Sequence, residues 1–221
     1  MTVVQPDKLP KAVLFDWDNT LVDTWPVIHD AMNAALAAMD HPVWTMDETR
    51  ARVRRALREA FPDLFGDRWE EARDVFYARF REIHLERLEV CIGAEELLRL
   101  LVERGVYLGV VSNKSGDHLR READHLGWSG YFSRLVGATD APKDKPARDP
   151  VIMALDGSGL ELGEHIWFVG DTRIDMECAY GATCTPVLIC ESDINEEEYT
   201  EFMPKYSFLS LPALTGLVSN L

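Results

Sequence analysis

The spacing of apolar residues changes character along the chain. Ala12–Phe15 is a short apolar run that follows Lys11, a pattern typical of a buried strand. Residues 24–90 instead place apolar residues at helical spacing, without a convincing strand. From Gly93 onward, apolar runs alternate with single helical segments. The pattern therefore predicts an α/β unit that is interrupted once, after its first strand, by a helical insert.

Three helices are expected within the insert. Thr24 is expected to cap the first, which carries Pro26 in its first turn. Thr45 and Glu48 have capping-box spacing and begin the second, which is expected to continue to Pro62. A third and longer helix begins near Asp67. The apolar residues on the inner face of the second helix are Val53, Leu57 and Phe61.

The remaining strands are each separated by one helix, which predicts right-handed crossovers and a parallel sheet with helices on both faces. We therefore expect a Rossmann-like catalytic core of residues 1–23 and 91–221, with an all-helical cap domain of residues 24–90 inserted after the first strand. The expected strands are residues 12–15, 106–111, 135–136, 166–169 and 186–190; the expected helices of the core are residues 94–103, 115–126, 149–156 and 173–180.

Composition narrows the class of protein. The 221 residues carry a formal net charge of −15, which disfavours nucleic acid and anionic membranes as partners. The four cysteines form no C-x-x-C pair, so reduced thiols in a cytoplasmic protein are expected. The first ten residues do not look like a signal peptide, and no apolar run has transmembrane length. A soluble protein of unspecified oligomeric state is expected.

Polar residues follow four of the predicted strands. Ligands of open α/β sheets bind at the carboxyl ends of the strands, where these residues are expected to converge. Asp16 and Asp18 come directly after the first strand, and their mutual repulsion favours a hard cation with oxygen ligands, usually Mg²⁺. The later strands are followed by Ser112-Asn113-Lys114, by a loop with Lys143 and Asp144-Lys145-Pro146, and by Gly170-Asp171-Thr172 with Asp175.

These motifs together resemble those of the haloacid dehalogenase superfamily of phosphohydrolases. The resemblance is to the branch with a helical cap after the first motif, which includes the phosphoglycolate phosphatases, and it extends from Val13 to about Ile189. All four motifs occur in order. They are Asp16-x-Asp18-x-Thr20, then Ser112, then Lys145-Pro146, and finally Gly170-Asp171-x-x-x-Asp175.

The resemblance implies a role for each acidic residue. Asp16 would be the nucleophile that forms an aspartyl-phosphate, and Asp18 the general acid and base. Mg²⁺ would be held by Asp16, the backbone carbonyl of Asp18, and Asp171, with Asp175 supporting this set. Asp18 also bears on reaction type, because the dehalogenases of this family lack a carboxylate at that position.

The resemblance likewise implies a phosphate-binding set of Ser112, Asn113 and Lys145, with Thr20 and Asn113 orienting their neighbours. Lys145 would offset charge on the nucleophile and on the phosphoryl group. The sequence leaves open whether Lys143 or Lys145 fills this role, although the adjacent proline favours Lys145. The chain departs from the family at position 19, where asparagine replaces the usual glycine; asparagine also tolerates a left-handed backbone.

The predicted function is Mg²⁺-dependent hydrolysis of a phosphomonoester of a small phosphorylated metabolite. A sugar phosphomutase of the same superfamily is the nearest alternative, because it uses the same pair of aspartates. A non-catalytic binding protein on the same fold is a second alternative. A phosphonate hydrolase is disfavoured, because that chemistry needs a cap lysine and none lies between Lys11 and Lys114.

Specificity is expected to come from the insert, which carries ten of the seventeen arginines. Arg50, Arg54 and Arg58 are spaced as one stripe on the predicted second helix. Such a stripe usually pairs with local acids, here Asp47 and Glu59. The functional alternative is that Arg54 or Arg58 binds a second anionic group of the substrate, which would favour an acidic ester such as phosphoglycolate.

Overall fold

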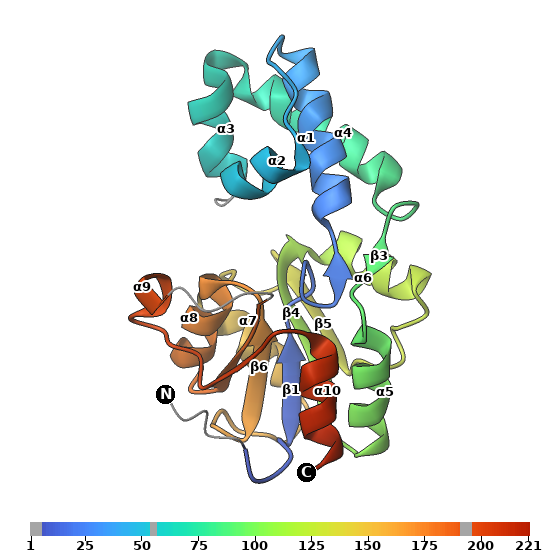
Figure 1. The fold of residues 1–221 in the computed structure, drawn as a ribbon, viewed down its shortest axis with the longest axis vertical. Helices are drawn as coiled ribbons and strands as arrows, with labels where there is room; N and C mark the ends of the chain where they lie inside the picture. Colours follow the sequence, from blue (N-terminus) through green and yellow to red (C-terminus); the bar gives the residue numbers. More distant parts are fainter. Residues whose placement is uncertain (1–5, 54–56, 191–195) are drawn as a thin grey trace. The chain divides into compact units, whose positions relative to one another are not determined.

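The computed structural model describes residues 6–53, 57–190 and 196–221, and only the backbone of residues 57–59. The chain divides into two compact units. One contains the chain up to Val22 and from Val90 onward, and the other is Asp23–Glu89. The chain passes between them at β2 (Val22–Asp23) and β3 (Glu89–Val90), which pair with each other as a two-stranded sheet (Figure 1).

The first unit is built on a six-stranded sheet in the order β5-β4-β1-β6-β7-β8, and every neighbouring pair is parallel. The expected Rossmann-like α/β fold is thereby confirmed. The central strand β1 is fully buried, which explains its continuous apolar run. The strands are β1 (Ala12–Phe15), β4 (Tyr107–Ser115), β5 (Arg134–Ala138), β6 (Ile166–Gly170), β7 (Thr185–Ile189) and β8 (Tyr206–Phe208).

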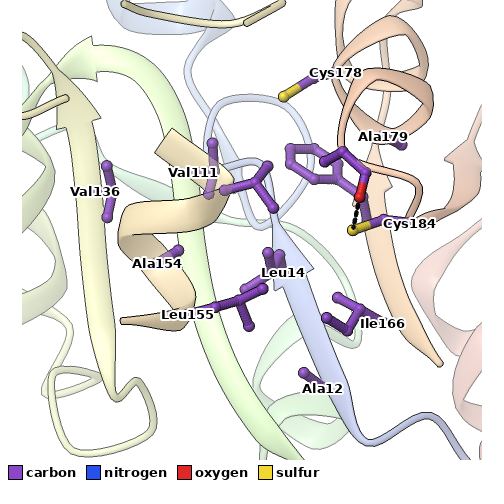
Figure 2. Close-up of a cluster of buried hydrophobic side chains, with 13 residues drawn as sticks. Ala12, Leu14, Val111, Val136, Ala154, Leu155, Ile166, Cys178, Ala179 and Cys184 are labelled. Atoms are coloured by element: carbon purple, nitrogen blue, oxygen red, sulfur yellow. Dashed lines mark hydrogen bonds between the residues drawn. The ribbon is translucent and has the colours of Figure 1, made fainter. Parts of the chain in front are cut away.

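Helices cover both faces of this sheet (Figure 1). On one face, Leu14 of β1 and Ile166 of β6 pack in one apolar cluster with Ala154 of α7 and Ala179 of α8 (Figure 2). On the other face, α5 and α10 pack against each other. The helices of this unit are α5 (Ala94–Glu103), α6 (Gly116–His125), α7 (Asp149–Leu155), α8 (Arg173–Gly181), α9 (Glu196–Tyr199) and α10 (Leu211–Ser219).

The second unit is helical and has a core of its own, in which α1 packs against α4. Phe61, Phe76 and Phe80 lie in this core together with alanine and methionine side chains of α1. Its elements are α1 (Trp25–Ala38), α2 (Met46–Arg52), α3 (Leu57–Phe65), η1 (Gly66–Arg68) and α4 (Trp69–Ile83).

The prediction of one continuous second helix is wrong. The capping box of Thr45 and Glu48 is present, but α2 ends at Arg52 and the backbone of Val53 is not helical. Repeated arginines at i, i+4 spacing repel one another, which disfavours a continuous helix in this stretch. Pro62 also does not end a helix, because it lies inside α3, where burial of the neighbouring Phe61 outweighs the hydrogen bond that proline lacks.

Two smaller differences concern the ends of elements. The side chain of Thr24 makes no capping hydrogen bond to α1; instead, the Trp25 N–H donates to the Asp23 carboxylate over 2.9 Å. Strand β4 extends to Ser115 rather than ending at Val111, with an irregular register between these two residues. The predicted Ser112-Asn113-Lys114 motif therefore lies on the final part of a strand.

Cys178 and Cys184 are buried thiols outside any disulfide. Burial raises the pKa of both of these thiols to about 12. In the described ranges, no helix combines the length and apolar character needed to cross a bilayer.

Candidate active site

The first site segment is the tight turn that follows β1. The Asp16 N–H donates to the Val169 carbonyl of β6 over 2.8 Å, so Asp16 lies beside the end of that neighbouring strand. The Val22 N–H then reaches back to the Trp17 carbonyl over 3.2 Å. Asn19 has a φ of 60°, the left-handed conformation that was expected of this residue in place of glycine.

The second segment follows β6 and depends on a glycine. A Cβ at Gly170 would lie 2.4 Å from the Asp175 side chain, so only glycine allows α8 to bring Asp175 this close. Asp175 Oδ2 accepts hydrogen bonds from the Thr172 N–H at 3.0 Å and the Thr172 hydroxyl at 2.6 Å. This capping box fixes the fully buried Asp175 carboxylate at the start of the helix.

Lys145 links these two segments. Its Nζ lies 2.6 Å from Asp16 Oδ1 and 2.7 Å from Asp175 Oδ1, and its side chain is only 4% exposed. Asn113 holds the backbone of this lysine from both sides: its Nδ2 donates to the Lys145 carbonyl at 3.1 Å, and its Oδ1 accepts from the Lys145 N–H at 3.0 Å. Lys143 is exposed, so Lys145 is the lysine of this loop that contacts Asp16.

Three carboxylates gather around this ammonium group. Asp16, Asp171 and Asp175 each offer an oxygen, and these oxygens all lie within 4.8 Å of one another. Burial raises the pKa of Asp16 to about 7; Lys145 opposes the rise, and Asp175 and Asp18 add to it. Burial also raises the pKa of Asp171, with further contributions from Asp175 and Asp16. Three carboxyl groups share one ammonium group here, so negative charge exceeds positive charge when all of them are ionised.

A small hard cation fits such a group. Its donors are all oxygens, the ligand type that Mg²⁺ prefers, and a bound cation would relieve the repulsion that raises the pKa values of Asp16 and Asp171. The hydroxyl of Thr20 donates to Asp171 Oδ1 over 3.2 Å and orients one of the candidate ligands.

The Asp18 carboxylate is engaged elsewhere. Its Oδ1 lies 2.6 Å from Lys114 Nζ, and the same Nζ lies 2.6 Å from Glu122 Oε2. Burial alone would lower the pKa of Lys114, but the carboxylates of Asp18 and Glu122 raise it above its ordinary value. Ser112, which is also buried, accepts a hydrogen bond from the Lys114 N–H through its Oγ at 3.1 Å.

No sequence motif indicated a role for Lys114, Glu122 or Trp17. The Trp17 Nε1–H donates to Glu122 Oε2 over 2.7 Å. One signal could have found Glu122. It falls at helical spacing with Leu119 and next to Ala123, on the buried face of α6, where a charged residue is unusual.

The structure describes the side chains of only some arginines of the insert. Arg54 lies outside the described residues, and the structure describes no side chain for Arg58. Arg79 and Arg87 both pair with Asp30 within the insert. The expectation that Arg54 or Arg58 contacts substrate therefore stays a prediction.

Comparison with known proteins gives a family match over residues 13–189, to the family described as haloacid dehalogenase-like hydrolase. The chain is 30% identical over 185 residues to a phosphoglycolate phosphatase of Pectobacterium atrosepticum, an alignment that covers 80% of this chain and 79% of the relative.

Solved structures show the same similarity. A haloacid dehalogenase superfamily hydrolase from Ehrlichia chaffeensis has a TM-score of 0.68 and 29% identity, and the match covers 98% of this chain and 99% of that one. A protein from Thermotoga maritima, described as a candidate β-phosphoglucomutase, has a TM-score of 0.78 and 19% identity, covering 96% and 100%. At 19% identity, this second likeness concerns the fold alone.

Proposed function

Because the chain belongs to the haloacid dehalogenase-like hydrolase family, we propose that it is a Mg²⁺-dependent phosphatase acting on a small phosphomonoester. One observation carries the proposal: the buried Lys145 ammonium lies 2.6 Å from Asp16, which directly follows β1, and 2.7 Å from Asp175, in the first turn of α8. Asp171 adds a third carboxylate to this group. This arrangement supports the roles proposed for these groups: Asp16 as nucleophile, the carboxylates as a cation site, and Lys145 as a positive group for phosphate.

In this proposal, Asp16, Asp171 and the backbone carbonyl of Asp18 would hold Mg²⁺, and Asp175 would support this set from its position on α8. When bound, the ion supplies positive charge that shields the phosphate dianion from the attacking carboxylate. Lys145 adds charge of the same sign beside Asp16. The contacts of Asn113 with the Lys145 backbone support a role in fixing this lysine rather than in binding phosphate.

The first step is attack of an Asp16 carboxylate oxygen on phosphorus. A new O–P bond forms, the bond from phosphorus to the ester oxygen breaks, and Asp18 donates its proton to that leaving oxygen. The products are an alcohol and an aspartyl-phosphate on Asp16. Ser112 is proposed to donate its hydroxyl hydrogen to a phosphoryl oxygen in this step.

The second step uses Asp18 as a base. Its carboxylate takes a proton from water, the water oxygen bonds to phosphorus, and the bond between phosphorus and the Asp16 oxygen breaks. Inorganic phosphate leaves, Asp16 is again a carboxylate, and Asp18 is again protonated for the next turnover. The atoms and protons balance over the cycle.

Phosphoglycolate is the first substrate candidate, because the Pectobacterium relative is named a phosphoglycolate phosphatase. Its carboxylate is also the kind of group that an arginine binds through two parallel hydrogen bonds. The proposed cap, residues 24–90, carries the arginines that would serve this purpose.

The test is a phosphate-release assay over a panel of phosphorylated metabolites, with Mg²⁺ and with a chelator. We expect Mg²⁺-dependent release, and we expect Asp16→Asn to lower kcat by about 10⁴ or more, because an amide is a poor nucleophile; this is about 5 kcal/mol of barrier. A folded Asp16→Asn protein with substantial activity would rule out the assignment. An isomerised ester without phosphate release would instead indicate a phosphomutase.

A further inference from the structure

A buried charged network lies beside the proposed catalytic residues. Glu122 on α6 is fully buried and accepts two hydrogen bonds through the same oxygen, one from Trp17 Nε1 at 2.7 Å and one from Lys114 Nζ at 2.6 Å. The side chain of Lys114 is also buried, at 5% exposed, and its Nζ lies 2.6 Å from Asp18 Oδ1. The network therefore ends on a carboxylate of the proposed mechanism.

Stability alone does not account for this network. Removing two or three charges from water costs several kcal/mol per ion, and apolar residues of similar volume often give an equal or more stable core. Glu122 occupies the apolar face of α6, beside Leu119 and Ala123, where an apolar residue would be ordinary. A buried carboxylate at this position therefore suggests a role in the site.

Trp17, at the end of the network opposite Asp18, is held rigidly by its packing. The Trp17 ring is fully buried and makes edge contacts with Trp128, at 5.9 Å between ring centroids, and with Phe132, at 6.3 Å. Its indole N–H is thereby fixed, and so is the Glu122 oxygen that accepts from it. A lysine on a long flexible side chain is held in one place when its ammonium group bridges this fixed oxygen and a second carboxylate.

We propose that Glu122 is a positioning residue: by holding the Lys114 ammonium, it fixes the orientation of the Asp18 carboxylate. The contact of Lys114 with Oδ1 sets the rotation of that carboxylate and hence the direction of Oδ2. The inference rests on the proposed function, in which Asp18 donates the proton to the leaving oxygen. Proton transfer requires heavy-atom distances near those of a hydrogen bond, so a misdirected carboxylate transfers the proton poorly.

The test compares two substrates that differ in their need for this proton. An alkyl phosphate such as phosphoglycolate has a poor leaving group, whereas p-nitrophenyl phosphate releases a stable anion without protonation. The parameter is kcat/KM, because it reports the steps up to release of the leaving group. For Glu122→Gln we expect kcat/KM to fall about 10-fold or more with the alkyl ester and less than about threefold with the aryl ester.

Asp124→Asn is the matched control, since it neutralises an exposed carboxylate two residues further along α6; it should leave both values unchanged. Glu122→Met, which fills the same space without charge, replaces the Gln variant if the latter does not fold. A crystal structure of the folded variant supplies a readout independent of activity, and we expect the Asp18 carboxylate to be rotated away from its position in the wild type.

Each outcome decides between the alternatives. A fall in kcat/KM that is selective for the alkyl ester, together with a rotated Asp18 carboxylate, supports the positioning role. The positioning role is overturned if kcat/KM falls equally with both esters, if it falls with neither, or if the Asp18 carboxylate has not moved. The proposed function remains intact in each of these cases. Absence of Mg²⁺-dependent phosphate release from the wild type, by contrast, overturns both proposals.

Discussion

Replacement of Lys145 by methionine is the most direct perturbation of the candidate site. Methionine keeps much of the length and apolar volume of the lysine side chain but removes the ammonium group. That group lies 2.6 Å from Asp16 and 2.7 Å from Asp175, which are two members of a set of three carboxylates that includes Asp171.

The magnitude follows from burial. Breaking a buried ion pair by removing one partner costs about 3–5 kcal/mol, because the remaining charge is left uncompensated. Lys145 is 4% exposed at its side chain and Asp175 is fully buried, so little water is available to replace the lost contact. We therefore expect metal-free Lys145→Met to lose about 3–5 kcal/mol of unfolding free energy at neutral pH.

The same change should lower activity. Loss of one preorganised group that stabilises charge in the transition state typically lowers kcat by about 10²–10³, or about 2.7–4 kcal/mol. Added Mg²⁺ should stabilise the variant more than the wild type, because the carboxylates of the variant lack their ammonium partner. The gain in unfolding free energy increases with the ratio of the Mg²⁺ concentration to the dissociation constant.

Urea denaturation with and without Mg²⁺ measures the stabilities, and phosphate release measures kcat. Lys143→Met is the matched control, because it removes an exposed lysine from the same loop and should change stability by less than about 0.5 kcal/mol. The reasoning fails if Lys143→Met loses activity while Lys145→Met keeps it, or if metal-free Lys145→Met is as stable as the wild type.

Three further predictions concern the metal, the pH dependence and the specificity. Asp171→Ala should weaken Mg²⁺ binding, so that part of its lost activity returns at high Mg²⁺; unchanged affinity in titration calorimetry would exclude Asp171 as a ligand. Burial raises the pKa of Asp16 from 3.8 to about 7, so folding of the metal-free protein favours the protonated form of Asp16. This contribution to stability is complete below about pH 4 and is lost as the pH rises through about 7, so the wild type should lose more stability than Asp16→Asn between about pH 5.5 and about pH 8.5 in urea denaturation. Arg54→Ala or Arg58→Ala should lower kcat/KM for phosphoglycolate relative to a neutral phosphoester; an unchanged ratio for both variants would place specificity elsewhere.

Local signals in the sequence determined much of the core. The apolar run of β1 and the single helices between later strands predicted a parallel sheet, because strands buried on both faces need continuous apolar residues and parallel strands need crossovers. The same pattern indicated which residues lie at or beyond the carboxyl end of each strand, although β4 extends through Ser112-Asn113-Lys114. Since the carboxyl ends of parallel strands share one edge, the proximity of Asp16, Lys145, Asp171 and Asp175 could be expected from the sequence alone.

Tertiary structure decided what depends on partners distant in the chain. Glu122 lies 105 residues from Trp17, and no local pattern indicates that its buried carboxylate accepts from that indole. Asn113 was expected both to bind phosphate and to orient its neighbours, but the sequence did not indicate that both ends of its amide bind the backbone of Lys145, 32 residues away. Periodicity shows which face of a helix is buried, but it does not identify the polar group across the interface, because that group is chosen by three-dimensional packing.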